Sequence, residues 1–379
     1  VISPNGGESW IAGSGQLVRW SATKLQSFTT TNNILKGGVI YRTLLAAVLP
    51  DYFDGTALVK KLTIPSDVPS GSDYTIEVVL TEPFSPLPIL LSKPLFKKGL
   101  VGVGSYKLAG IRLRGDKVSY LRLLPVDSDS DLIPITLKFY PSEEAAKIGF
   151  TLGEVQSLDE IVNPEPFTNW QHVTVRETVR FNRYVALFFN MKHDLMKEKN
   201  FRQALSYALE KPSENGVLTP LSSQSWAYNA TVKEYAIDMV QARKLLERVI
   251  PATESAEITI STFDQYIGLA QEIADQWEKL GLTVKVQTEN NVPQDYQVLL
   301  ASQEIPPDPD QYPFWHSTQL TTNVTRYTNA KVDKLLEDGR QEYDSTKRKL
   351  IYYEFQRTLA EDVPAIFLFH PTTYTVSRD

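Results

Sequence analysis

Cysteine is absent from all 379 residues of the chain, and histidine occurs only four times. Without cysteine the protein has no disulfide bond, no thiolate metal site and no cysteine nucleophile, which is compatible with an exported bacterial protein. The histidines are His172, His193, His316 and His370, and no two of them are three or four residues apart. Because a local zinc or nickel site favours that spacing, we expect no metal and no cofactor.

Long apolar runs are missing as well. No window approaches the run of about 18 apolar residues that a membrane-spanning helix needs. The sequence begins at Val1 without the charged segment and apolar stretch of a signal peptide. We therefore interpret its start as a processed or trimmed end, and the cysteine of a membrane-anchored lipoprotein would lie upstream of it.

A basic surface for nucleic acid is also missing. The chain carries 39 basic and 45 acidic residues, a formal net charge of −6, and these residues form no long run of one sign. The GxSxG, HExxH, P-loop and dinucleotide-binding glycine motifs do not occur. We predict a protein that is not an enzyme and binds no nucleic acid.

The first 80 residues read as a small all-β segment. Short runs rich in β-forming residues alternate with turn clusters such as "SPNGG" and "PSDVPSGSD", without a helical period of convincing length. The runs are "QLVRW", "GVIYRTLL", "LVKKLTI" and "YTIEVVL". In such a unit, Trp10 and Trp20 are expected to be core rings.

From about residue 81 the pattern is mixed α/β. "PITLKFY" predicts a strand, and "SEEAAKIGFTLGEV" predicts a helix with Ser142 as N-cap and Gly153 as its stop. Further on, "AEITIST", "YIGLAQEIADQWEKLG" and "LTVKVQT" predict a strand, a helix and a parallel strand. The fold class is therefore α/β after an all-β segment.

The helix predicted for "NFRQALSYALEK" is amphipathic. Its apolar face holds Phe201, Ala204, Leu205, Ala208 and Leu209 at helical spacing, and we expect Arg202 and Gln203 to point away from the core.

The stretch "PPDPDQYPFWHSTQ", residues 306–319, is too rich in proline for a helix or a central strand. We expect a semi-rigid loop that presents Tyr312, Phe314 and Trp315. Two interpretations stay open. The rings line a ligand site, or Phe314 and Trp315 fill the core while Asp308 and Asp310 cap turns.

Two resemblances refine this picture. "SPNGGESWIAGSGQLVRWSA" and "LTIPSDVPSGSDYTIEV" resemble the two edges of a β-sandwich repeat related to the yeast cell-wall Kre9/Knh1 proteins and found on bacterial surface proteins. Residues 81–379 resemble the family 5 extracellular solute-binding proteins, the peptide, nickel and oligopeptide receptors of ABC importers. The segments that carry this second resemblance include "LKFYPSEEAAKIGFTLGEV", "FNMKHDLMKEKNFRQALSYALEK", "PDPDQYPFWHSTQ" and "NVTRYTNAKVDKLLEDGR".

The second resemblance implies a two-lobe periplasmic-binding-protein-like (type II) fold. Lobe one would hold residues 81–184 and 366–379, and lobe two residues 185–365, with the chain crossing between them near "YVALFFN" and "PAIFLF". The long N-terminal part that builds most of lobe one in this family is absent, and the all-β segment stands in its place. Lobe one is therefore expected to be incomplete.

The implied function is the extracytoplasmic substrate-binding component of an ABC importer, which captures a peptide or similar small solute and delivers it to a membrane permease. Peptide receptors of the family usually hold the ligand's amine with an aspartate three residues before the "DP" pair, where this chain has Ile305. The residues expected at the ligand are Asp308, Asp310, Tyr312, Phe314, Trp315, Arg326 and Trp226.

Two other functions remain open from the sequence. The protein is alternatively a cell-envelope interaction protein, in which the β-sandwich attaches to an envelope polymer and the receptor lobe has degenerated. A glycan hydrolase with a carboxylate pair such as Glu304 and Asp308 is the third interpretation.

Overall fold

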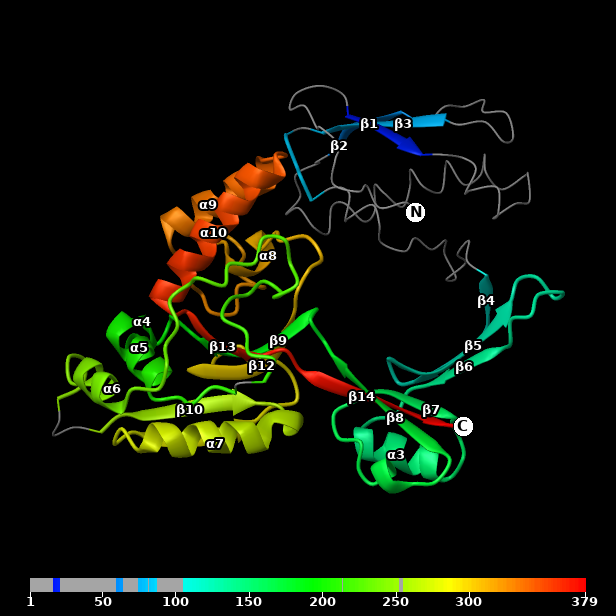
Figure 1. Cartoon of the computed structure of the whole chain (residues 1–379), viewed down its shortest axis with the longest axis horizontal. Helices are drawn as coiled ribbons and strands as arrows, with labels where there is room; N and C mark the ends of the chain where they lie inside the picture. The colour runs from blue at the N-terminus through cyan, green and yellow to red at the C-terminus, as the bar shows by residue number, and fades with distance from the viewer. Residues whose placement is uncertain are drawn as a thin grey trace. The chain divides into compact units, whose positions relative to one another are not determined.

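The computed structural model describes residues 16–20, 59–63, 74–80, 82–86, 105–212, 214–251 and 255–379 (Figure 1). These residues divide into two compact units, 1–158 and 159–379. Trp10 and the run "GVIYRTLL" lie outside the described residues.

The described residues of unit one form two antiparallel three-stranded sheets. The first has the order β1-β3-β2, from β1 (Gln16–Trp20), β3 (Tyr74–Leu80) and β2 (Val59–Thr63). These strands confirm three of the four β-runs predicted in the first 80 residues. The second sheet has the order β4-β5-β6, from β4 (Tyr106–Arg114), β5 (Lys117–Pro125) and β6 (Ile135–Lys138).

Helix α3 (Glu143–Thr151) follows β6 as predicted. The Ser142 side chain accepts a hydrogen bond from the Ala145 N–H at 3.2 Å, and so satisfies one of the free donors at the helix start. Gly153 lies just beyond the end with φ of +76°, a conformation that glycine adopts without strain. Both predicted ends of this helix are confirmed.

Unit two is built on a five-stranded mixed sheet with the order β11-β10-β12-β9-β13. The strands are β11 (Thr283–Thr288), β10 (Glu257–Thr262), β12 (Val298–Glu304), β9 (Arg183–Phe189) and β13 (Ala365–Phe369). Strand β10 runs parallel to β11 and β12, whereas β9 is antiparallel to β12 and β13. The predicted parallel pair joined by helix α7 (Ile267–Glu278) is confirmed.

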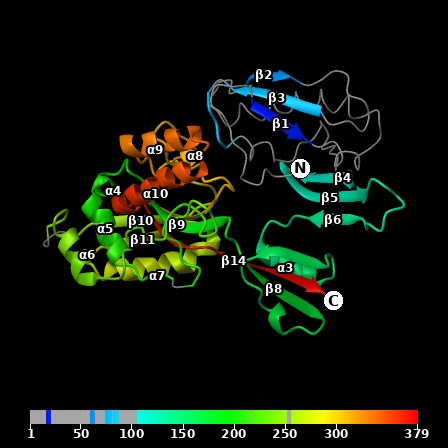
Figure 2. The same cartoon turned by 45° about the horizontal axis from the view of Figure 1, so that its top comes forward.

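Helices cover both faces of this sheet (Figures 1 and 2). One face packs against α5 (Lys199–Tyr207), α6 (Met239–Leu246) and α7, and the other against α8 (Tyr312–Trp315), α9 (Ala330–Gln341) and α10 (Ser345–Asp362). Strand β9 has apolar side chains on both faces of the sheet, so helices must cover both faces. Its residues Val185, Leu187 and Phe189 enter the first core, and the alternating residues Tyr184, Ala186 and Phe188 enter the second.

A smaller sheet of order β7-β14-β8 follows β13, from β7 (Ser157–Ile161), β14 (Thr372–Arg378) and β8 (Val173–Val179). The described residues also contain three short helical segments: η4 (Phe167–Asn169), α4 (Asp194–Lys197) and η5 (Asp264–Tyr266).

The run "AIFLF" corrects the expected lobe boundaries. As β13 it pairs with β9 in the sheet that also holds β10, so the assignment of residues 366–369 to the first lobe is wrong. The boundary at 184/185 likewise falls inside β9. Strands β13 and β14 are consecutive runs of strand-forming residues, but they belong to different sheets. The residue types show that both runs form strands, and they do not show which sheet each strand joins.

The chain leaves the five-stranded sheet at two short linking segments, residues 180–182 and 370–371. They are bonded to each other, because the Arg180 N–H donates to the Pro371 carbonyl at 2.8 Å. The Arg180 side chain adds a hydrogen bond from Nε to Thr373 Oγ1 at 2.7 Å. The buried His370 ring bonds through Nδ1 to the Arg183 carbonyl at 2.6 Å.

Helix α5 contains a second correction. Its predicted apolar face is buried, but Arg202 and Gln203 are buried too rather than pointing into solvent. Arg202 donates to the carbonyls of Met196, Lys197, Asp362 and Val363, and the Gln203 amide donates to Tyr235 Oη at 3.0 Å. These side chains satisfy carbonyls at the ends of α4 and α10, which helix ends leave without partners.

Candidate functional site

The proline-rich loop 306–319 is fixed by two ion pairs. Asp308 accepts two hydrogen bonds from the Arg348 guanidinium, at 2.8 and 2.6 Å. Asp310 pairs with Arg340, whose Nη2 lies 2.9 Å from Oδ2. None of these four side chains is more than 14% exposed. Such bidentate charged pairs give the loop a defined geometry that its own backbone does not provide.

The same carboxylates also shape the backbone of the loop. Asp308 Oδ1 accepts from the Asp310 N–H at 2.9 Å, and Asp310 Oδ1 accepts from the Tyr312 N–H at 3.1 Å. This is the turn-capping role foreseen for both residues. Both oxygens of Asp308 are therefore occupied by Arg348.

Trp315 fills the core. Its side chain is 2% exposed, and its ring lies 6.1 Å from that of Phe367 between centroids. Phe314 packs against the same core from a half-buried position. Of the two roles open for these rings, the packing supports the core-filling one.

Tyr312 lies between a cation and a histidine. Its ring stacks on His316 at 4.0 Å between centroids, and the Arg340 guanidinium carbon is 3.8 Å from the Tyr312 ring centre. His316 Nδ1 accepts from the Thr318 N–H at 3.2 Å, so we assign the ring proton to Nε2. The half-buried Tyr312 is therefore held in one orientation.

Arg326 has an unusual backbone conformation. It adopts a φ of +54°, a left-handed conformation that non-glycine residues rarely keep without a reason. Within the residues described here, its half-buried guanidinium makes no ion pair or hydrogen bond. Burial raises the pKa of Tyr296 to about 12, and the charge of Arg326 acts against that rise, so the two side chains are close. The guanidinium remains available to a carboxylate.

Trp226 is an exposed ring on a fixed loop. It is 43% exposed, and the Arg348 guanidinium carbon lies 5.8 Å from its ring centre. The loop behind it is held by the buried Gln356, which donates to the Ala227 carbonyl at 2.7 Å and accepts from the Asn229 N–H at 3.0 Å. These bonds fix the backbone next to Trp226.

Ile305 and Glu304 occupy the start of the loop. Ile305 is buried in the core beneath α8 to α10, so it presents no polar group to a ligand amine. The Glu304 side chain is 75% exposed and lies 3.4 Å from Arg183. Glu304 is therefore the accessible carboxylate nearest in sequence to the position of the usual aspartate.

Sequence reasoning missed Arg340, Arg348 and Gln356. Their partners lie 30, 40 and 129 residues away, and no local spacing marks such pairs. Among the described residues, no three His, Cys, Asp or Glu side chains lie together so that they could hold a metal ion, and no helix is long and apolar enough to cross a bilayer.

The fold of the chain defines a class of protein. Two solved structures share this fold at low sequence identity. AppA from Bacillus subtilis, solved with a nonapeptide, matches with a TM-score of 0.70 and 19% identity over 90% of this chain and 79% of AppA. NikZ from Campylobacter jejuni, solved with Ni(L-His), matches with a TM-score of 0.76 and 20% identity over 90% of this chain and 78% of NikZ. The fold is that of type II periplasmic binding proteins.

The chain belongs to the bacterial extracellular solute-binding proteins, family 5, whose middle-region sequence pattern matches residues 39–324. The match starts before residue 81, so the family region extends into the segment assigned to the all-β unit. The oligopeptide-binding protein AppA of Bacillus subtilis is 26% identical over 281 residues, 63% of this chain and 51% of AppA.

Di/tripeptide-binding protein 1 of Pseudomonas aeruginosa is 24% identical over 358 residues, 85% of this chain and 64% of that protein. The chain thus spans about half to two thirds of the length of these relatives.

Proposed function

We propose that the protein is the extracytoplasmic substrate-binding component of an ABC importer, which captures a short peptide or a similar small solute and delivers it to a membrane permease. The match to family 5 over residues 39–324 carries this proposal. The related AppA and Di/tripeptide-binding protein 1 are peptide-binding proteins by name, which favours a peptide over a nickel complex.

In this proposal the ligand lies between two lobes. Lobe two contains the five-stranded sheet, and the linking segments 180–182 and 370–371 lead to the first lobe. The two hydrogen-bonded linkers suit a hinge, because few backbone torsions then change on closure. In the alternative proposal, residues 1–80 would attach the protein to an envelope polymer and the receptor lobe would have no transport function.

We propose that the ligand contacts Arg326, Trp226 and Tyr312. The guanidinium would bind the peptide's terminal carboxylate through two parallel hydrogen bonds, and the indole would cover an apolar side chain. Asp308, Asp310, Phe314 and Trp315 contribute by holding the loop in place, because their side chains are already engaged in ion pairs or the core.

The direct test is to denature the purified protein and to identify the released small molecules by mass spectrometry. We expect a short peptide, and we expect peptides from tryptone to raise the melting temperature of ligand-free protein. If no small molecule is released and no peptide raises the melting temperature while circular dichroism shows folded protein, the envelope-interaction alternative is favoured.

A second test uses the buried Ile305. Because no carboxylate stands at this position, acetylation of a bound peptide's N-terminus should lower the affinity by less than tenfold, about 1.4 kcal/mol. A larger loss would show that another carboxylate holds the amine, and Glu304→Gln would then be the variant that removes the difference between free and acetylated peptide.

A further inference from the structure

The hairpin formed by β4 and β5 in unit one extends beyond its third strand. The two strands pair up to the turn, where Arg114 lies opposite Lys117. Strand β6 pairs with β5 only as far as Tyr120. Beyond that point the described part of this sheet is a ribbon of two strands. The hairpin tip, residues 111–118, includes this ribbon and the residues at its base.

The hairpin tip exposes large apolar side chains. Every residue from 111 to 117 is exposed, and the exposed fractions of Leu113 and Ile111 are 61% and 46%. Along β4 these two side chains alternate with Arg112 and Arg114. Single apolar side chains on a surface are common, but two of them between arginines, at the end of a projecting ribbon, favour a contact surface.

The hairpin tip also carries an excess of positive charge. Arg112, Arg114 and Lys117 stand against one carboxylate, Asp116, which gives a net charge of +2. In the described part of the chain, the side chains of Arg114 and Lys117 make no ion pair or hydrogen bond, and Arg112 lies over the ring of Tyr120 at 5.1 Å. These cations are therefore available to anions outside the chain.

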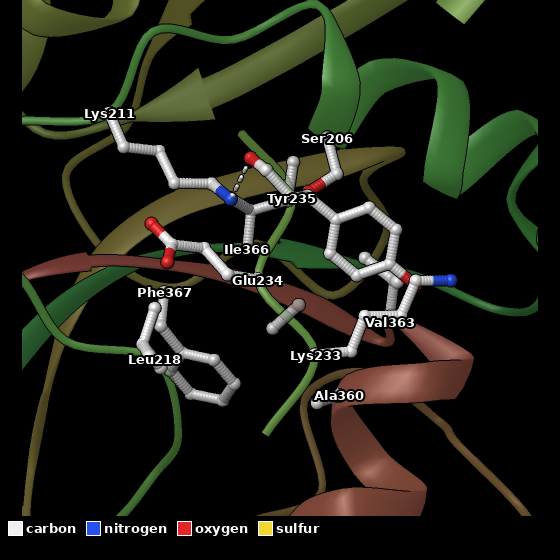
Figure 3. A pocket seen from close by; sticks show the side chains of 11 residues that line it. Ser206, Lys211, Leu218, Lys233, Glu234, Tyr235, Ala360, Val363, Ile366 and Phe367 are labelled. Atoms are coloured by element: carbon white, nitrogen blue, oxygen red, sulfur yellow. Dashed lines mark hydrogen bonds between the residues drawn. The ribbon is translucent and has the colours of Figure 1, made fainter. Parts of the chain in front are cut away.

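The small pocket of unit two shows the opposite situation for a cation. It contains the ammonium group of Lys211, whose Nζ donates to the Tyr235 backbone carbonyl at 2.9 Å (Figure 3). The acidic residue Glu234 lines the same pocket. This cation is already compensated within the fold, whereas the cations of the hairpin tip face solvent.

We propose that the hairpin tip binds the surface of an anionic lipid bilayer. Leu113 enters the boundary between headgroups and acyl chains, while the guanidinium of Arg114 and the ammonium of Lys117 pair with lipid phosphates. A soluble polyanion would satisfy the cations but leave the exposed leucine in water, so the combined pattern favours the bilayer. The ribbon suits this position because its two strands satisfy each other's backbone groups.

The first test is flotation of the full chain with lipid vesicles. Vesicles of phosphatidylglycerol and phosphatidylcholine in equal parts are compared with vesicles of phosphatidylcholine alone. The anionic vesicles should bind the protein at least about tenfold more strongly, because the cations of the hairpin tip are attracted to an anionic surface. Equal binding to both kinds of vesicle, or no binding by folded protein, overturns the proposal.

A pair of charge variants locates the contact. Arg114→Gln/Lys117→Gln removes two positive charges from the hairpin tip and should weaken binding to anionic vesicles by about tenfold or more. Lys244→Gln/Arg248→Gln removes the same charge from exposed positions of unit two and is the matched control. Its binding should stay within about threefold of the wild type, because only screened, long-range attraction is lost. Equal losses in the two variants would mean that net charge alone determines binding, which overturns the proposal.

The absence of cysteine allows a direct test of insertion. Leu113→Cys carries an environment-sensitive fluorophore at the hairpin tip, and Leu350→Cys carries the same fluorophore on α10, at a position that is 63% exposed. On anionic vesicles the emission of the tip label should shift to shorter wavelength, and that of the α10 label should not. Vesicle binding without a shift at position 113 overturns the proposal, because the contact would then depend on charge alone, as with a soluble polyanion.

Discussion

The five-stranded sheet is covered in two physically different ways. Helix α7 lies on one face by apolar burial, with Ala270, Ile273, Ala274 and Trp277 in the core. On the other face, the loop 306–319 with the short helix α8 depends on buried charge, through the pairs of Asp308 with Arg348 and Asp310 with Arg340. Apolar burial thus holds the regular helix α7 on the sheet, whereas buried ion pairs hold the irregular loop 306–319 on it.

The difference follows from where the backbone hydrogen bonds go. A regular helix satisfies its own N–H and C=O groups, so burial of one apolar face is enough to place it. A proline-rich loop has few such bonds, and side chains must accept from its N–H groups and fix its position. Rigid placement of such a loop therefore requires charged groups in the core, and these stabilise the fold only as intact pairs.

The largest effect is expected when one buried pair is broken. Arg348→Met leaves Asp308 buried without its cation and also removes the bond from Arg348 Nε to the Gly339 carbonyl. We expect a loss of about 3–5 kcal/mol in the free energy of unfolding. Urea unfolding followed by circular dichroism measures this loss.

The matched control lies on the same helix. Arg357 pairs with Glu354 on the exposed side of α10, so Arg357→Met should leave the unfolding midpoint unchanged within error. If the two variants lose the same free energy of unfolding, the buried Asp308–Arg348 pair stabilises the fold no more than a surface ion pair does.

A smaller difference in the free energy of unfolding is expected between variants of the two core tryptophans. Trp277 Nε1 donates to the Leu205 carbonyl at 3.0 Å, whereas in the described part of the chain Trp315 Nε1 has no hydrogen-bond partner. Replacement by phenylalanine leaves a buried carbonyl unpaired only at position 277. We expect Trp277→Phe to destabilise by about 1 kcal/mol more than Trp315→Phe in the same urea experiment. The reverse order would mean that Trp315 has a polar partner.

A pH dependence is expected at the linking segments. Burial lowers the pKa of His370, partly offset by the bond from Nδ1 to the Arg183 carbonyl. The unfolded state then binds more protons, so stability is fully present above about pH 6.5 and falls as the pH drops towards the folded pKa. His370→Asn should flatten this acid-side decline in thermal unfolding. An unchanged slope in the variant would assign the decline to other groups.

Local features of the fold were predictable from sequence, and long-range polar pairing was not. The cap at Ser142, the stop at Gly153 and the parallel β10–α7–β11 unit depend on neighbouring residues, and all appear as predicted. Arg202 was expected in solvent but is buried, because the carbonyls that it satisfies end a helix some 160 residues away. The spacing of apolar residues predicts which face of a helix is buried, but it does not predict which polar side chains form buried hydrogen bonds.

The candidate site shows the same division. The turn-capping aspartates foreseen in 306–319 are present, but the expectation that the segment contains no helix is wrong. Tyr312–Trp315 form the short helix α8, because Pro313 lies in its first turn, where a missing N–H costs no hydrogen bond. The sequence left the role of Trp315 open, because the residue type alone does not distinguish a core tryptophan from one that lines a ligand cleft. It placed Arg326 among several candidates, but its left-handed conformation and free guanidinium become visible only in three dimensions.

The central claim is that the exposed Trp226 touches ligand while the buried Trp315 supports the fold. Trp226→Ala and Trp315→Ala are compared for retention of tryptone peptides, measured by mass spectrometry after gel filtration, and for unfolding in urea. Trp226→Ala should weaken peptide binding by about 1–3 kcal/mol with little loss of stability. Trp315→Ala should lower the free energy of unfolding by about 3–5 kcal/mol through the cavity it leaves. Unchanged peptide binding in folded Trp226→Ala, or unchanged stability in Trp315→Ala, would contradict the account.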